Sequence, residues 1–422
     1  MVKKYAKEKY KGCQIMLKKK KIAVVNVLFP PKAFGGATRI VTDEIFVLTE
    51  QYGDDYEVVV FTADFERSPA YKLTVYPYNG YRVYSISIHT DWWCEVDERM
   101  GKVFDEFLAF EQPDLVHFHC IQALTGSVVE VTQKRNIPHL ITVHDAWWIS
   151  DYQFLTDQSG KIYPEGHPDP FEKINLPDGK TLEQSIKRRS YLKGLLAGSD
   201  GVLAVSDVFR RIYEKNGVAH VRTNKNGISD EPQWRPKNTG YSEKVVCAHI
   251  GGMAAHKGYD IFKNAVHELG DSNVEILLVD SSKPEGYSAK TRWGNTTVTI
   301  IGYVNQKDIV SLYERIDVLF APSIWPESFG LVTREATACG CWVVGSDVGA
   351  IGEDITVENG FKISATKENL LAVLNKIDRS PKKYKGFSSS GNIRYSSDQV
   401  GELTQIFDEI LKKNANENSL AN

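Results

Sequence analysis

The chain has 422 residues, which is enough for two domains of ordinary size with substantial hydrophobic cores. Hydrophobic residues account for 42% and charged residues for 25%, which is typical of a globular protein in water. The net charge of −3 argues against general nucleic-acid binding, and no segment approaches the roughly 20 apolar residues of a membrane-spanning helix. The cysteines are scattered and no secretory leader is evident, so we expect a cytoplasmic protein with free thiols.

The first segment, residues 1–20, is a basic extension. Nine lysines and one glutamate lie within residues 1–21, with a few apolar side chains between them. Two interpretations stay open: a solvated extension, or an arm drawn to anionic lipid, where each basic residue contributes about 1 kcal/mol. The second interpretation would place the protein peripherally at the inner face of the membrane.

Short apolar runs separated by longer polar–apolar segments follow the extension. Such runs are typical of buried parallel strands, and the segments between them of crossover helices. This alternation predicts a doubly wound α/β domain over residues 21–228. The predicted strands are 21–27, 58–61, 115–119, 140–144 and 201–206.

A second series of apolar runs begins near Lys244 and predicts another domain of the same class over residues 243–396. The polar stretch 229–242 is the predicted linker, and residues 397–422 are expected to form a terminal helix and tail. We therefore expect an α/β fold with two Rossmann-like doubly wound domains that face a cleft. The predicted strands of the second domain are 245–250, 274–279, 298–301, 318–321 and 342–344.

The segment 326–335 carries the strongest functional signal. Its proline keeps the chain out of a helix, which we expect to begin near Phe329. The first free N–H groups of that helix, around Gly330 and Leu331, would then point at one place. That place has a partial positive charge and suits a phosphate.

Two glutamates flank this predicted phosphate site. Glu327 precedes the helix and Glu335 lies inside it, so each can accept hydrogen bonds from sugar hydroxyls on one side of the phosphate. The pattern of two glutamates separated by seven residues, with Phe-Gly following the first, resembles the signature of retaining glycosyltransferases of family 4. These enzymes have the GT-B architecture. The resemblance implies sugar transfer from a nucleoside diphosphate sugar to an acceptor hydroxyl with retention at the anomeric carbon. It also implies that Glu327 holds the donor sugar and Glu335 the ribose.

Other segments match the family's donor-binding pattern. Gly35 and Gly36 open a helix after the first strand, where backbone can approach a ligand closely. Lys257 matches a cation that grips the diphosphate, but Gly252 stands where the family has arginine, so one cationic contact is missing. A Gly-x-Val loop is expected to contact the nucleobase. The predicted donor-binding residues are Gly35, Gly36, Gly252, Lys257, Tyr303, Val304, Glu327, Phe329, Gly330, Leu331 and Glu335.

The segment 144–151 looks like that of bacterial enzymes that build surface polysaccharide, which implies a glycan or a lipid-linked acceptor. His144 is expected to border the donor sugar and is, with Lys257 and Glu327, one of three predicted catalytic residues. The acceptor-side candidates are Asp145, Trp147 and Trp148, because aromatic faces suit the apolar C–H faces of sugars.

His117 and His119 form a His-Phe-His pair at a strand end, which could ligate a metal. No nearby carboxylate or cysteine is evident in the sequence to complete a set. Enzymes of the GT-B architecture do not need a bound metal, so we predict neither a metal nor another cofactor.

Three alternative functions stay open. The two glutamates could act as the acid and base of a hydrolase, the chain could be a nucleotide-sugar epimerase, or it could be a catalytically silent sugar-binding scaffold. The reaction products distinguish them, since transfer needs an acceptor and hydrolysis needs only water. The sequence does not identify the donor sugar, its base or the acceptor.

Overall fold

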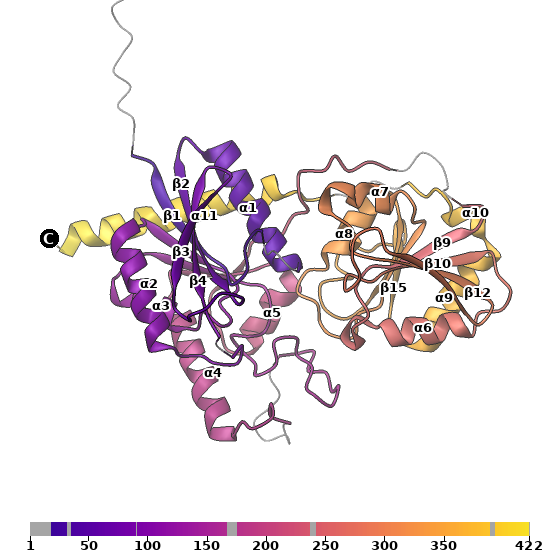
Figure 1. Ribbon diagram of the computed structural model, residues 1–422, viewed down its shortest axis with the longest axis horizontal. Coiled ribbons are helices and arrows are strands. Elements are labelled where there is room, and N and C mark those ends of the chain that lie inside the picture. The colour runs from indigo at the N-terminus through magenta and orange to yellow at the C-terminus, as the bar shows by residue number, and fades with distance from the viewer. Residues whose placement is uncertain are drawn as a thin grey trace, which may run out of the picture.

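The computed structural model confirms an α/β protein with two Rossmann-like domains, which appear as two lobes in Figure 1. The lysine-rich segment 1–17 lies outside the described residues, so the predicted arm stays a prediction from sequence. The structure describes residues 18–31, 35–89, 91–166, 175–236, 242–388 and 393–421.

The N-terminal domain is built on an eight-stranded sheet in the order β3-β4-β2-β1-β5-β6-β7-β8. Its central strands are parallel and buried, as their continuous apolar runs predict. The strands are β1 (Lys20–Val25), β2 (Tyr56–Asp64), β3 (Leu73–Tyr78), β4 (Tyr81–Ser87), β5 (Leu115–Phe118), β6 (His139–Val143), β7 (Gly201–Ala204) and β8 (Val221–Thr223). The helices are α1 (Gly36–Tyr52), α2 (Glu98–Glu111), α3 (Ser127–Lys134), α4 (Leu182–Ala197) and α5 (Asp207–Lys215).

The C-terminal domain is built on a seven-stranded sheet in the order β11-β12-β10-β9-β13-β14-β15. Its strands are β9 (Val245–His249), β10 (Val274–Val279), β11 (Ser288–Trp293), β12 (Thr296–Ile301), β13 (Val318–Ala321), β14 (Trp342–Ser346) and β15 (Gly360–Ile363). The helices are α6 (Tyr259–His267), α7 (Ile309–Tyr313), α8 (Leu331–Ala338), α9 (Lys367–Arg379) and α10 (Pro381–Tyr384), with 3-10 turns at Ala255–Lys257 and Gln306–Asp308.

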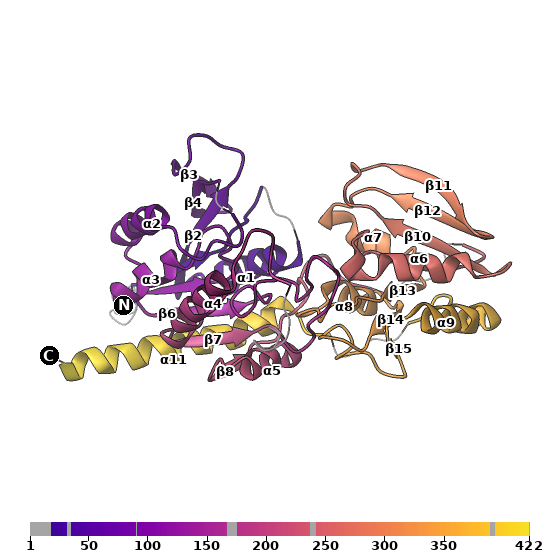
Figure 2. The ribbon, with the colours of Figure 1, turned by 90° about the horizontal axis from the view of Figure 1, so that it is seen from below.

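The last helix, α11 (Ser396–Ala421), returns to the N-terminal domain and runs along it (Figures 1 and 2). Its residues Val400, Leu403 and Phe407 are fully buried in the N-terminal core, and they recur with helical spacing. The chain therefore passes from one domain to the other twice, once between β8 and β9 and once between α10 and α11.

Two antiparallel strands at the sheet edges differ from the predicted parallel pattern. β3 pairs antiparallel with β4, and β11 with β12. The turn between β3 and β4 is Asn79-Gly80, and both residues have positive φ, which suits a tight hairpin.

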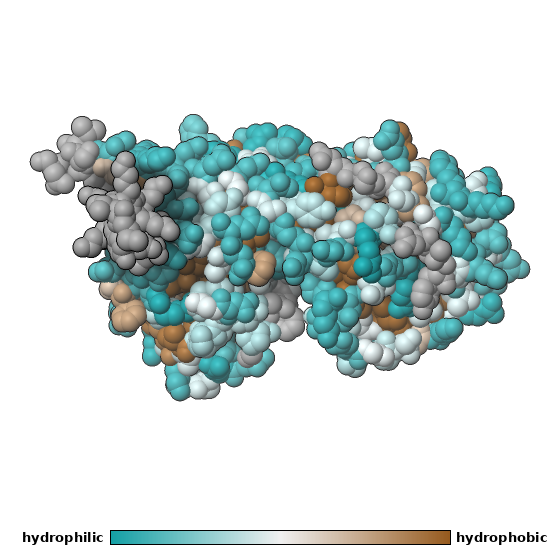
Figure 3. Space-filling model, turned by 90° about the horizontal axis from the view of Figure 1, so that it is seen from above, coloured by the Kyte–Doolittle hydropathy of each residue, from teal (hydrophilic) through white to brown (hydrophobic). Residues whose placement is uncertain are grey.

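The outer surface is mostly hydrophilic on the face seen in Figure 3, with hydrophobic residues in small separate groups. Within the described residues, none of the helices combines the length and apolar content needed to cross a bilayer.

Candidate active site

The predicted phosphate-binding helix is α8, which begins at Leu331, two residues later than expected. Gly330 immediately before it has φ of 83°, and an added Cβ would meet the Ile351 side chain at 2.8 Å, so glycine is required there. Phe329 is 5% exposed, and the Arg334 guanidinium lies 4.0 Å from its ring centroid. Phe329 is therefore buried against Arg334 of α8, and the Gly330–Leu331 backbone opens the helix.

Lys257 and Glu327 come together at the carboxyl ends of the C-terminal strands. Lys257 Nζ donates to Glu327 Oε1 over 2.9 Å, and the Ser323 hydroxyl donates to the same oxygen. Burial opposes ionisation, but Lys257 and Ser323 hold the pKa of Glu327 below its usual value. The Lys257 side chain is 26% exposed, so a cation reaches the surface beside a buried carboxylate.

Glu335 lies at the boundary between the domains. Arg39 Nη1, from the first turn of α1, donates to Glu335 Oε1 over 2.7 Å, and the Tyr313 hydroxyl donates to Oε2 over 2.8 Å. The Glu335 side chain is 3% exposed, and burial raises its pKa against the opposing effect of Arg39. Both carboxylate oxygens therefore already have a donor from the protein.

Among the glycines predicted to approach the donor, Gly35 and Gly252 lie in the chain between a strand and the following helix, and Gly36 is the first residue of α1. Gly35 and Gly252 have φ of 84° and 78°, a region that favours glycine. An added Cβ at Gly35, Gly36 or Gly252 would meet no atom within 4 Å, so open space adjoins each. The Gly252 carbonyl accepts a hydrogen bond of 3.0 Å from the His249 ring, which anchors the turn where the family has arginine.

Tyr303 and Val304 follow β12 and line a pocket of about 280 Å³. The Tyr303 side chain is 49% exposed, and Glu285, Tyr287 and Asn305 also line the pocket. The pocket lies in the loops beyond the carboxyl end of β12, where open α/β sheets bind ligands.

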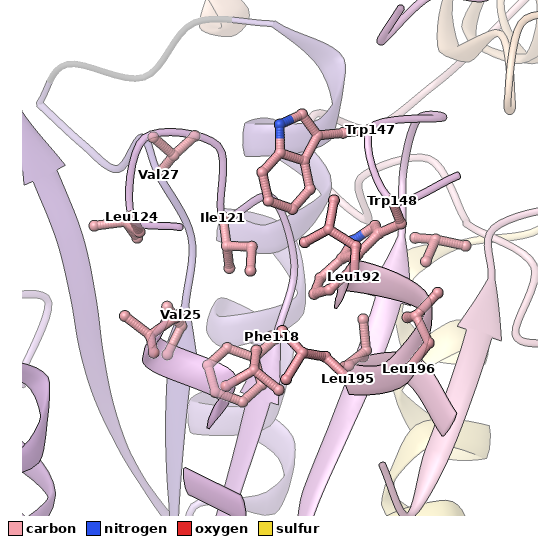
Figure 4. Packing of buried hydrophobic residues seen from close by; sticks show 14 of the residues in the cluster. Val25, Val27, Phe118, Ile121, Leu124, Trp147, Trp148, Leu192, Leu195 and Leu196 are labelled. Carbon is pink, nitrogen blue, oxygen red and sulfur yellow. The ribbon is translucent and has the colours of Figure 1, made fainter. Parts of the chain in front are cut away.

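The predicted acceptor-side residues are not arranged as we expected. Trp147 and Trp148 are 3% and 2% exposed and pack among the apolar side chains of the N-terminal core (Figure 4), so their faces are not available to a sugar. Asp145 is 6% exposed, and its carboxylate accepts hydrogen bonds from within the protein. Trp92 is a partly exposed aromatic residue nearby: it is 42% exposed, its ring stacks on Phe65, and its carbonyl accepts a 2.7 Å hydrogen bond from the Trp147 indole.

His144 follows β6 and is 7% exposed. Its Nε2 lies 2.9 Å from Nδ1 of His119. The sequence offered no obvious carboxylate for His117 and His119, and this premise was wrong: Glu44 of α1 lies 2.9 Å from His117 Nδ1 and 3.4 Å from His119 Nε2. One ligand atom of each of these three residues lies within 4.8 Å of the other two.

Phe154 is a contact between the domains that sequence reasoning missed. It lies in the long segment between β6 and α4, and its ring stacks on His256 with centroids 5.3 Å apart. The same ring meets Trp325 edge-on at 5.1 Å. Since His256 precedes Lys257, this irregular N-terminal segment reaches the candidate site of the C-terminal domain. Long loops in compact domains often have a function, and this contact is consistent with one.

Two family profiles match the chain. The profile described as Glycosyltransferase Family 4 matches residues 34–231, and the profile of Glycosyl transferases group 1 matches residues 230–393. They meet at the linker, so each domain has its own match, and together with the fold they define a two-domain glycosyltransferase of the GT-B architecture. The chain belongs to the glycosyltransferases of family 4, as the motif around Glu327 predicted.

The relatives and solved structures agree with this assignment. An uncharacterized glycosyltransferase of Methanocaldococcus jannaschii is 23% identical over 272 residues, 64% of this chain and 65% of that protein, slightly less than two thirds of its length. Sucrose-phosphate synthase of Thermosynechococcus elongatus has a TM-score of 0.69 at 18% identity, covering 94% of this chain and 100% of that one. Anabaena HepE in complex with UDP and glucose has a TM-score of 0.59 at 16% identity, covering 95% and 99%. At these identities the solved structures establish the shared fold alone.

Proposed function

We propose that this glycosyltransferase moves a sugar from a nucleoside diphosphate sugar to an acceptor hydroxyl and retains the anomeric configuration. The observation that carries the proposal is the convergence of Lys257, Glu327 and the amino end of α8 at one edge of the C-terminal sheet. A cation and free backbone N–H groups suit a diphosphate, and the carboxylate beside them suits sugar hydroxyls.

Each part of the donor has a candidate partner. The diphosphate lies against Lys257 and the Gly330–Leu331 backbone, the sugar against Glu327 and His144, and the ribose against Glu335. The base lies in the pocket beside Tyr303 and Val304. Anabaena HepE, which has the same fold, was solved with UDP and glucose, and this supports a nucleotide donor here.

The protein contributes positioning and electrostatic stabilisation to the reaction. As the bond between the anomeric carbon and the diphosphate breaks, negative charge develops on the leaving oxygen. Lys257 and the start of α8 stabilise that charge. The acceptor hydroxyl attacks from the same face, and its proton passes to the leaving phosphate. Retention follows because the incoming oxygen takes the side that the leaving group vacates.

The acceptor is a glycan or a lipid-linked glycan, and the basic extension brings it to the enzyme at an anionic membrane surface. This part rests on the lysines of residues 1–20 and on the resemblance of residues 144–151 to surface-polysaccharide enzymes. Sedimentation with anionic vesicles tests it, with and without residues 1–20. Attachment should weaken with salt, as the Debye length falls from ~10 Å at ~0.1 M to ~3 Å at ~1 M. Equal binding by the truncated protein would contradict it.

A thermal-shift screen of nucleoside diphosphate sugars tests donor recognition. A ligand at about 100 times its dissociation constant stabilises the native state by about 2.7 kcal/mol, which is a measurable rise in the unfolding temperature. We expect one nucleoside diphosphate series to stabilise the protein. No stabilisation across the uridine, guanosine, adenosine and thymidine series would contradict the proposal.

A further inference from the structure

A line of buried polar side chains runs from α1 through β5 to the residue after β6. Glu44 Oε1 lies 3.4 Å from His119 Nε2, and His119 Nδ1 lies 2.9 Å from His144 Nε2. His117 Nδ1 joins the same carboxylate oxygen at 2.9 Å, and its Nε2 lies 2.7 Å from the Thr142 hydroxyl. Glu44, His117 and His119 are at most 1% exposed, whereas His144 at the end of the line is 7% exposed.

The atoms that meet at Glu44 have nothing else to bond. Glu44 Oε1, His117 Nδ1 and His119 Nε2 are buried and make no hydrogen bond of regular geometry among the described residues, so these short contacts are their polar surroundings. A buried carboxylate is unfavourable unless it is paired, so its place on the apolar face of α1 needs an explanation beyond packing.

The proton positions along the line follow from the chemistry of the groups. Burial alone would raise the pKa of Glu44, but the two adjacent histidines hold it below its usual value, so the carboxylate is ionised and can only accept. Burial lowers the pKa of His119 to about 4 and that of His144 well below its usual value, so both rings are neutral at neutral pH. A neutral imidazole has one N–H donor and one acceptor nitrogen.

One arrangement satisfies every contact in the line. His119 directs its Nε2 proton toward Glu44 Oε1, 3.4 Å away, which leaves His119 Nδ1 as an acceptor. His144 must then donate its own Nε2 proton to His119, which leaves His144 Nδ1 without a proton. That nitrogen has no hydrogen-bond partner among the described residues, and it belongs to the most exposed ring of the line.

We propose that Glu44 and His119 are positioning residues that fix His144 as its Nε2–H tautomer, so that Nδ1 accepts a hydrogen bond from a hydroxyl of the donor sugar. The inference rests on the proposed function, because that function places His144 beside the donor sugar. Glu44 thereby acts on the site through two histidines and touches no substrate itself.

A metal ion held by Glu44, His117 and His119 is the competing explanation of the cluster. Tetrahedral zinc has bonds of about 2.0–2.1 Å to nitrogen and oxygen, which separates its ligand atoms by roughly 3.3 Å. The distance of 2.9 Å between His117 Nδ1 and Glu44 Oε1 is shorter than that separation, whereas His119 Nε2 and Glu44 Oε1, at 3.4 Å, are close to it. The short contact favours the proton-fixing line, and the metal content of the protein decides between the two explanations.

Nitrogen-15 NMR of histidine-labelled, ligand-free full-length protein tests the proposal, because the two ring nitrogens report which of them carries the proton. His119→Asn and His144→Asn variants assign the signals. We expect His119 and His144 in the parent protein to be neutral Nε2–H tautomers. A parent His144 that is charged, or protonated at Nδ1, would overturn the proposal.

The variant Glu44→Gln keeps the shape of the side chain and adds an amide donor. It should allow His119 to carry its proton on either ring nitrogen, so that His144 is no longer fixed as the Nε2–H tautomer. The matched control is Glu111→Gln, since Glu111 is also buried in this domain but bonds to Lys21, Arg82 and Tyr84 and to no histidine. The control should leave the His144 signals unchanged, and unchanged His144 signals in Glu44→Gln would contradict the line.

Elemental analysis of the parent protein is a second test. About one equivalent of a bound transition metal that is lost in Glu44→Gln would show that the cluster is a metal site and would contradict the proton-fixing line. Neither measurement uses a donor or an acceptor. Absence of sugar transfer by the parent protein would therefore contradict the proposed function and leave the tautomers as measured.

Discussion

Arg39 donates to Glu335 across the boundary between the two domains, with Nη1 2.7 Å from Oε1. Arg39 lies at the glycine-rich start of α1, and Glu335 lies in the helix that we expect to bind the donor. The carboxylate proposed to hold the ribose therefore also joins the domains. Under the proposed assignment, the ribose would either share Glu335 with Arg39 or displace it, and donor binding would then be linked to the contact between the domains.

The first prediction concerns Glu335. Glu335→Ala should weaken binding of the matching nucleoside diphosphate roughly tenfold or more, since a hydrogen bond to a charged group contributes about 1.5–3 kcal/mol. Calorimetric titration measures the affinity. Glu314→Ala is the matched control, because Glu314 is in the same domain and also pairs with an arginine, Arg235, at 3.0 Å. Unchanged affinity in Glu335→Ala would contradict the assignment of Glu335 to the ribose.

The second prediction concerns Lys257. Because Gly252 stands where the family has arginine, Lys257 should carry an unusual share of the diphosphate charge. Lys257→Ala should cut turnover at least roughly tenfold, which corresponds to about 1.4 kcal/mol of transition-state stabilisation. Lys263→Ala on α6, whose ammonium lies 5.7 Å from the Trp293 ring centroid, serves as the control. Turnover near that of the parent would mean that the phosphate is held elsewhere.

The third prediction concerns metal dependence. Lys257, the amino end of α8 and the backbone are expected to neutralise the leaving diphosphate, so transfer should survive excess chelator. The assay compares initial rates with and without EDTA, after preincubation long enough to strip a slowly exchanging ion. If EDTA abolishes transfer and magnesium or manganese restores it, this account of leaving-group stabilisation is wrong.

The fourth prediction concerns Asp43, one turn after Arg39 on α1. Burial raises its pKa from 3.8 to about 6 against the opposing effect of Arg39, while Ser229 of the linker donates to its carboxylate over 3.2 Å. Between pH 4 and 6 the native state therefore holds a proton that the unfolded chain has released. The contribution of Asp43 to stability is full below about pH 4 and is lost as the pH rises through about 6.

The variant Asp43→Asn should remove this dependence. At about 1.36 kcal/mol for each pKa unit, the effect is on the order of 3 kcal/mol. Chemical unfolding of parent and variant at pH 4.5 and pH 7.5 measures it. Relative to the parent, the variant should have a higher free energy of unfolding at pH 7.5 than at pH 4.5. An equal change of this free energy with pH in both proteins would show that Asp43 does not titrate in this range.

Strong local patterns in the sequence predicted most of the fold. Apolar runs such as 274–279 and 318–321 could be recognised as buried strands because parallel strands are apolar on both faces. The edge strands β3 and β11 are only partly buried and lack such runs. The Asn79-Gly80 turn signalled the β3–β4 hairpin and could have been used.

Candidate site residues could be named from sequence where they belong to a local motif, and their tertiary contacts could not. Glu327 and Lys257 could be named from sequence, but their 2.9 Å contact joins residues 70 positions apart. Trp147 looked suited to a sugar, yet burial was decided by packing that a local pattern does not encode. Glu44 carried a usable signal, since it lies on the buried stripe of α1 with Val41 and Leu48.

The central claim is that sugar passes from a nucleoside diphosphate to an acceptor hydroxyl with retention. Proton NMR of the reaction, with the donor found in the screen and a panel of saccharide acceptors, tests it most directly. The account predicts that nucleoside diphosphate and a new glycoside form in equal amounts. It also predicts that the anomeric proton of the product shows the configuration of the donor. Diphosphate release at the same rate without an acceptor, a product of inverted configuration, or an epimerised donor with its diphosphate bond intact would contradict it.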